Sequence, residues 1–253
     1  MAEPTSRSQT GALLDGFRLL ARRPAWTLGL IVLGTLLSQL GPALEIAAKA
    51  GNNALMGMAL AWAALLPMEL YFIPRWLSRL DADLLGDPQN APAEWPKRFD
   101  ERWLRAFAAS LLVQALGGVG LLFLIIPGVV LLTLLGFAPM RVLLRGSRIG
   151  DAMRWSARSM ARHWPPVMSA ALAILIFAFA GSLALALAQN AVFARFGDAG
   201  PDAWTRLKHP FMWISQAIGA AALLWVSAAF LSLYQRLEKL TTLNPDSPDP
   251  RLQ

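Results

Sequence analysis

Long apolar runs separated by short basic segments dominate the chain. A helix needs about 20 mostly apolar residues to cross the roughly 30 Å hydrocarbon layer of a bilayer. Six segments meet this requirement, over about residues 24–44, 54–73, 106–125, 128–144, 166–190 and 211–234. The third and fourth share one apolar block, and Pro127-Gly128 near its middle predicts a helical hairpin that turns there. The pattern predicts an all-α, polytopic membrane protein in which residues 1–240 form one domain of six transmembrane helices and residues 241–253 form a disordered tail.

The distribution of basic residues predicts the orientation of these spans. If both termini are cytoplasmic, 19 of the 23 Lys and Arg residues lie on the cytoplasmic side and 4 on the other side. Cytoplasmic loops of membrane proteins collect Lys and Arg in this way. We expect the first apolar run to be a span and not a cleaved signal peptide, because the long polar region before it contains Glu3 and Asp15.

A basic amphipathic helix is predicted between the fourth and fifth spans, at Asp151–Trp164. Its arginines recur every four residues and share one helical face, while apolar side chains line another face. Such a helix lies in the headgroup layer of a membrane, where it contacts anionic lipids or a cytoplasmic partner. A second helix of this kind is predicted at Pro96–Arg105. The predicted contact residues are Arg154, Trp155, Arg158, Arg162 and Trp164.

Composition narrows the possible functions. The chain is 56% hydrophobic and only 15% charged, with a mean hydropathy of +0.46, which excludes an ordinary soluble enzyme and a disordered chain. The net charge of +7 is explained by basic cytoplasmic segments, so no nucleic-acid partner is predicted. Cysteine is absent and only two histidines occur, so neither a metal site nor a cofactor is predicted.

Ionisable groups inside predicted spans are the remaining candidates for a functional site. Glu69 follows Pro67 in the second predicted span, and Arg141 follows Pro139 at a similar depth in the fourth. We expect Glu69 and Arg141 to pair. One interpretation is a proton- or substrate-binding site, with Gln114 among the amides of a polar path. The other, which is favoured, is a structural ion pair near the membrane boundary.

Three glycines at 117, 118 and 120 do not follow a strand, so they do not form a phosphate-binding loop. Small residues on apolar helices commonly allow close helix packing. We therefore expect these glycines to mark a close helix contact or a bend.

The segment Leu122–Pro166 is the most distinctive part of the chain. Its sequence runs from Leu124-Ile125-Ile126-Pro127-Gly128-Val129-Val130 through Phe137-Ala138-Pro139 to Asp151-Ala152-Met153-Arg154-Trp155-Ser156-Ala157-Arg158 and His163-Trp164. It resembles the membrane domain fused to some bacterial glycerophosphodiester phosphodiesterases and the stand-alone YciC-like inner-membrane proteins. The resemblance implies a six-span protein of the bacterial cytoplasmic membrane. It implies no phosphodiesterase activity, which belongs to a separate soluble domain, and it supplies no catalytic residues.

Two functional hypotheses follow from the sequence. The leading one is a non-enzymatic protein of the bacterial inner membrane, either an accessory subunit of a larger assembly or a factor in envelope or lipid homeostasis. Its expected partners are anionic membrane lipids and a membrane protein or a second copy of the chain. The alternative is a small transporter or permease with a polar path near Glu69, Arg141 and Gln114. No catalytic residue is predicted under the leading hypothesis.

Overall fold

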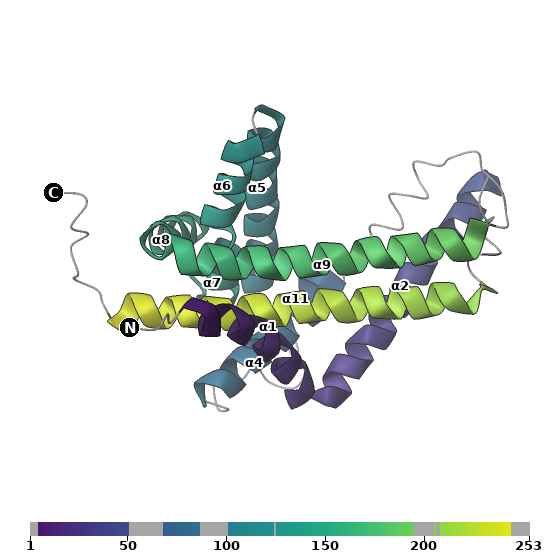
Figure 1. Ribbon diagram of the computed structural model, residues 1–253, viewed down its shortest axis with the longest axis horizontal. Helices are drawn as coiled ribbons and strands as arrows, with labels where there is room; N and C mark the ends of the chain where they lie inside the picture. Colours follow the sequence, from purple (N-terminus) through teal and green to yellow (C-terminus); the bar gives the residue numbers. More distant parts are fainter. Residues whose placement is uncertain are drawn as a thin grey trace.

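The computed structural model describes residues 5–50, 68–86, 101–123, 125–194, 205 and 208–243, and every regular element among them is a helix (Figure 1). The predicted all-α class is therefore confirmed for this part of the chain. The predicted second span, 54–73, lies mostly outside the described residues. Its last residues form a short π-helix, η1 (Met68–Phe72), which leads into α4 (Ile73–Leu85).

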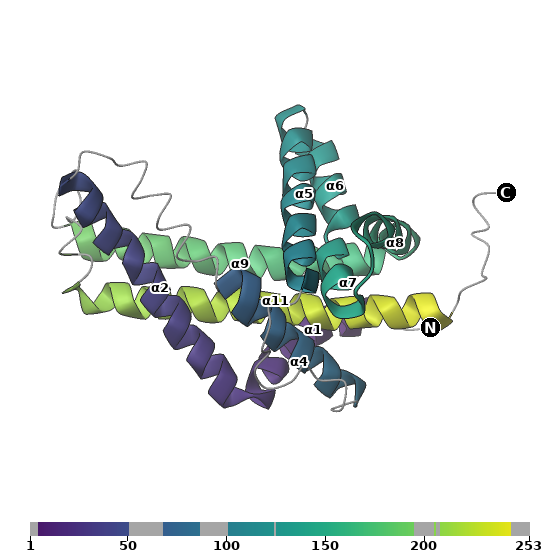
Figure 2. The ribbon, with the colours of Figure 1, turned by 180° about the vertical axis from the view of Figure 1, so that it is seen from behind.

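Two long helices form the spine of the molecule. α9 (Trp164–Phe193) and α11 (Pro210–Leu243) lie side by side in both ribbon views (Figures 1 and 2). Segments of α5 (Glu101–Phe123), α9 and α11 are long and apolar enough to cross a membrane. On α9, large apolar side chains such as Ile176 and Phe179 are 66% and 71% exposed. Exposed apolar surface of this extent indicates a membrane location.

The predicted hairpin is present as α5 packed against α6 (Ile125–Leu135). The predicted turn position is wrong, because Pro127 and Gly128 lie in the first turn of α6, where a proline is tolerated. A Cβ atom on Gly120 would lie 2.8 Å from the Gly128 Cα, and one on Gly117 would clash with the Leu132 side chain. These two glycines therefore permit the close approach of the two helices, as predicted. Gly118 faces open space.

The helix predicted over 128–144 is interrupted. α6 ends at Leu135, and α7 (Ala138–Arg145) begins after Gly136-Phe137. Pro139 is the second residue of α7, and it has no N–H to donate to the Leu135 carbonyl four residues earlier. Glycine and proline together stop the helix here and restart it in a new direction.

Apart from α2, the remaining helices lie around the half of the spine that holds the C-terminal end of α11 (Figures 1 and 2). α1 (Thr5–Arg22) lies along the C-terminal half of α11, where Trp225 Nε1 donates to the Leu13 carbonyl at 3.3 Å. α2 (Pro24–Ala50) leaves the end of α1 diagonally, and α8 (Ile149–Arg162) packs beside α6 and α9. The α5–α6 hairpin stands crosswise to α9 and α11 (Figures 1 and 2).

The predicted amphipathic segment 151–164 corresponds to helix α8. The predicted helix at Pro96–Arg105 lies partly outside the described residues, and its last part, from Glu101, is the first turn of α5. The predicted tail begins later than expected, because α11 continues to Leu243. The following residues, 244–253, lie outside the described part of the chain.

Candidate functional site

An arginine at the end of α7 joins three helices. Arg145 donates to Asp81 Oδ2 on α4 at 2.8 Å and to both carboxylate oxygens of Glu238 on α11, with its shortest contact at 2.5 Å. The helix ends one residue later at Gly146, whose φ of 64° suits glycine best. The planar guanidinium of Arg145 carries several N–H donors in a fixed geometry, so it can donate to both oxygens of one carboxylate and to a second carboxylate at the same time.

Other side chains complete the pairing of these carboxylates. The Gln235 amide donates to Asp81 Oδ1, and the Tyr234 hydroxyl donates to Glu238 Oε1 at 3.2 Å. Burial raises the pKa of the Asp81 carboxyl above its usual value, and the hydrogen bond from Arg145 opposes that shift. Hydrogen bonding to Glu238 raises the pKa of Arg145.

Two more ion pairs lie at the same end of the molecule. Arg23, between α1 and α2, makes a two-pronged contact with Asp83 on α4 at 2.6 and 2.7 Å, and its hydrogen bonds lower the pKa of the Asp83 carboxyl. Arg236 on α11 donates to Asp15 on α1 at 2.6 Å. We call the set of these groups the charged layer: Asp15, Arg23, Asp81, Asp83, Arg141, Arg145, Arg236 and Glu238.

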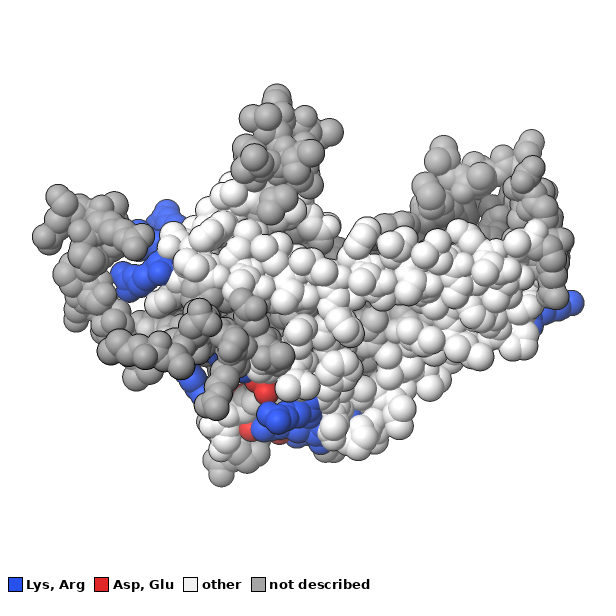
Figure 3. Space-filling model, viewed as in Figure 1, with Lys and Arg blue, Asp and Glu red and all other residues white. Residues whose placement is uncertain are grey.

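Figure 3 shows how charge is distributed over one face of the molecule. The surface over α9 and α11 is white along most of its length. Blue groups lie near α8 and, together with red groups, near the ends of α1 and α4, while a further blue group lies at the far end of the α9–α11 pair. In this view the apolar surface over α9 and α11 separates the charged group at the far end of the pair from those near α8 and near the ends of α1 and α4.

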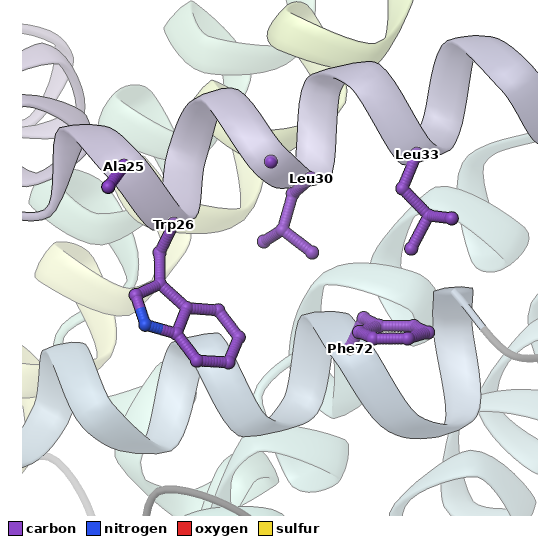
Figure 4. A pocket seen from close by; sticks show the side chains of 6 residues that line it. Ala25, Trp26, Leu30, Leu33 and Phe72 are labelled. Atoms are coloured by element: carbon purple, nitrogen blue, oxygen red, sulfur yellow. The ribbon is translucent and has the colours of Figure 1, made fainter.

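An apolar pocket of about 330 Å³ lies between α2 and the start of α4. In Figure 4, Trp26, Leu30 and Leu33 project from α2 toward the helix that carries Phe72. The Arg79 guanidinium lies 4.7 Å from the centre of the Trp26 ring. The pocket lining is almost entirely apolar and offers no group for acid–base or nucleophilic chemistry.

A second pocket, of about 350 Å³, is rich in basic and hydroxyl side chains. It opens where α7, α8 and the C-terminal end of α11 meet. We call it the basic pocket, and its lining residues are Arg141, Trp155, Arg158, Ser159, Arg162, Glu238, Thr241 and Thr242.

The structure describes the predicted intramembrane site only in part. The Glu69 side chain lies outside the described part of the structure, so its pairing with Arg141 is not tested. Arg141 contacts Glu238 at 3.5 Å and stacks 4.2 Å from the centre of the Trp155 ring. Gln114 is exposed on α5, and its amide donates to Ser110 of the same helix at 3.3 Å.

The predicted headgroup contacts divide into two groups. Trp155, Arg158 and Arg162 line the basic pocket, whereas Arg154 and Trp164 do not. Sequence reasoning did not identify Arg145, Asp81 or Glu238. The only local signal was the spacing of four residues between Arg141 and Arg145 on one helix face.

Among the side chains that the structure describes, no group of three or more His, Asp or Glu residues could hold a metal ion. The chain matches no protein-family model, no curated protein and no solved structure.

Proposed function

We propose that the chain is a non-enzymatic, multi-pass protein of the bacterial cytoplasmic membrane whose helix α8 contacts anionic lipid headgroups. Its role would be that of an accessory subunit or of a factor in envelope or lipid homeostasis. The resemblance of Leu122–Pro166 to YciC-like membrane proteins supports the bacterial assignment.

The two-sided character of α8 carries this proposal. Ala152 and Met160 are fully buried against the protein, and the Ser156 hydroxyl anchors the helix by donating to the Leu134 carbonyl at 2.7 Å. Arg154 and Arg158 are exposed on the other side. A helix held in this way presents its cations to the surroundings at a fixed depth, which suits the phosphate level of a membrane.

The six-span topology with both termini in the cytoplasm is also a proposal. The charged layer supports it, because segments around residues 15, 23, 81, 145 and 236 meet at one end of the molecule, and the basic-residue count assigns all of them to the cytoplasmic side. Six spans in one bilayer require the α5–α6 hairpin, which stands crosswise in Figure 1, to turn alongside α9 and α11.

The transporter hypothesis has less support from the described residues. Arg141 is engaged by Glu238 and Trp155, and Gln114 bonds within its own helix. A transport path needs polar groups that converge on a site near the bilayer midplane. These two residues do not converge.

Native mass spectrometry of the protein extracted gently from bacterial membranes tests the proposed function. The wild type should retain phosphatidylglycerol or cardiolipin, and a variant with Arg154, Arg158 and Arg162 all changed to Gln should lose it. At about 1 kcal/mol per basic residue near a membrane surface, the three changes should weaken retention about 100-fold.

A matched control removes the same charge elsewhere. Arg18, Arg105 and Lys239 are exposed and lie outside the basic pocket, so their joint change to Gln should leave lipid retention nearly unchanged. Equal retention in the two triple variants would contradict the proposal. Co-purification of a stoichiometric protein partner would favour the accessory-subunit role.

A further inference from the structure

We propose that the basic pocket binds the phosphate group of one anionic phospholipid. This inference rests on the proposed function, because it places α8 at the headgroup level. It goes further by assigning a defined site, with side chains from three helices, to a contact that could otherwise be spread along the surface of α8.

The charge balance of the pocket favours an anion. Its one carboxylate, Glu238, is already held by Arg145 at 2.5 Å and by the Tyr234 hydroxyl. Arg158 forms no ion pair with any residue that the structure describes. With Arg141 and Arg162 also in the lining, the pocket keeps an excess of positive charge after Glu238 is neutralised.

One arginine of the pocket, Arg141, is held by two neighbouring side chains. Arg141 lies over the Trp155 ring, 4.2 Å from its centre, and contacts Glu238 at 3.5 Å. Stacking on an aromatic face fixes the plane of a guanidinium and leaves its N–H groups at the edge, which is the arrangement that binds phosphate oxygens well. Less side-chain freedom is then lost when a phosphate binds.

The hydroxyl groups of the lining differ in their availability. Thr241 and Thr242 donate to backbone carbonyls of their own helix. Ser159 is 4% exposed as a whole residue, and its hydroxyl makes no hydrogen bond with the described residues. Because Ser159 lines the pocket, this hydroxyl can donate to a phosphate oxygen that enters it.

The position of the pocket favours a lipid over a soluble phosphate. Its threonines belong to the last turn of an apolar helix long enough to cross a membrane, which extends to Thr242. Leu240, between lining residues of α11, is 43% exposed. A phosphate held here would let the acyl chains of its lipid extend along α11 toward the apolar part of that helix. The volume of about 350 Å³ lies at the lower end of the range of about 300–1,000 Å³ for small-molecule sites.

The test compares two arginines one helical turn apart. Both Arg158 and Arg154 are exposed on α8, but only Arg158 lines the pocket. Full-length protein in a non-ionic detergent is titrated with palmitoyl-oleoyl phosphatidylglycerol, and the bound lipid is counted by native mass spectrometry. Arg158→Gln should raise Kd about tenfold, as for the loss of a charge-assisted hydrogen bond. Arg154→Gln should raise Kd less than about threefold.

Further arms separate the alternatives. Arg158→Lys keeps the charge but loses the planar fork, and should give an intermediate Kd. Zwitterionic phosphatidylethanolamine, whose ammonium group offsets the charge of its phosphate, should bind the wild type more weakly than phosphatidylglycerol does. Glycerol 3-phosphate, which carries the phosphate without acyl chains, should displace the lipid only at far higher concentration.

Each opposing result overturns a specific statement. Equal effects of Arg154→Gln and Arg158→Gln would overturn the assignment of the binding site to the basic pocket, while leaving the proposed headgroup contact by α8 intact. If glycerol 3-phosphate bound as tightly as the lipid, the ligand would be a soluble phosphate ester and not a lipid. Unchanged lipid binding in the variant that lacks Arg154, Arg158 and Arg162 would overturn the proposed function as well.

Discussion

Replacement of Arg145 by glutamine should destabilise the protein more than the loss of an ordinary surface arginine. Arg145 is the one described cation that contacts both Asp81 and Glu238, and thereby links α4, α7 and α11. Glutamine is uncharged and too short to donate to both carboxylates. The variant keeps Gln235 on Asp81 and Tyr234 on Glu238, but these neutral groups compensate the buried negative charge only partly.

The magnitude follows from how far the groups are buried. Removal of one partner from a fully buried ion pair costs about 3–5 kcal/mol, whereas an exposed pair contributes about 0.2–1 kcal/mol. The side chains of Arg145, Asp81 and Glu238 are 27%, 7% and 18% exposed, and Arg141 remains 3.5 Å from Glu238. We expect a loss of about 2–3 kcal/mol. In a chain of 253 residues, this corresponds to about 5–10 °C in Tm.

Thermal unfolding in a mild detergent, followed by tryptophan fluorescence, measures this loss. Arg105→Gln is the matched control, because its pair with Glu101 is 3.9 Å long and the two side chains are 44% and 89% exposed. The control should shift Tm by no more than about 2 °C. Neutralising Asp81 and Glu238 together with Arg145 should restore part of the loss. An Arg145→Gln shift no larger than the control shift would refute the reasoning.

Two further predictions concern packing and topology. Gly120→Ala should lower the free energy of unfolding by about 1–3 kcal/mol, because the added Cβ would lie 2.8 Å from the Gly128 Cα. Gly118→Ala is the control, because a Cβ added there has no atom within 4 Å. In the same detergent assay it should be neutral or slightly stabilising. Because the chain has no cysteine, the single variants Lys208→Cys and Lys239→Cys can each be labelled with a membrane-impermeant maleimide. The two cysteines should react from opposite faces of the membrane. Reaction from the same face would contradict α11 as a span.

The sequence was sufficient to predict those features that depend on local periodicity. The arginine spacing in Asp151–Trp164 predicted α8, which the structure places at Ile149–Arg162. The length of the apolar block around Pro127-Gly128 predicted the α5–α6 hairpin, although these two residues lie in α6 and not at the turn. Helix α1 was not predicted, although Leu13, Phe17 and Leu20 recur at helical spacing. Their signal is weak because polar residues surround them and the run is short of a membrane span.

The charged layer could not be predicted because its partners are distant in sequence. Arg145 lies 64 positions from Asp81 and 93 from Glu238. Any arginine on the cytoplasmic side could pair with any of several carboxylates, and only the packing of α4, α7 and α11 selects among them. The same holds for the basic pocket, where Arg141 takes its orientation from Trp155 on another helix. Local spacing identifies a charged face, but the neighbouring elements determine its partners.

The length of α11 explains how charged residues can end an apolar span. Its apolar segment, Pro210–Thr242, has 33 residues, or about 50 Å of helix at about 1.5 Å per residue. The hydrocarbon layer takes up about 30 Å, so roughly four turns extend beyond it. If the span begins near Met212, the hydrocarbon layer ends near Leu231, and Arg236 and Glu238 lie about 10 Å further on. At that depth the cost of a charge is far lower than at the bilayer centre, and the phosphates of the lipid are within reach. The charged layer and the basic pocket therefore lie at the same depth along the membrane normal. The ion pairs of the charged layer hold the helices together, and the basic pocket is open to an anion.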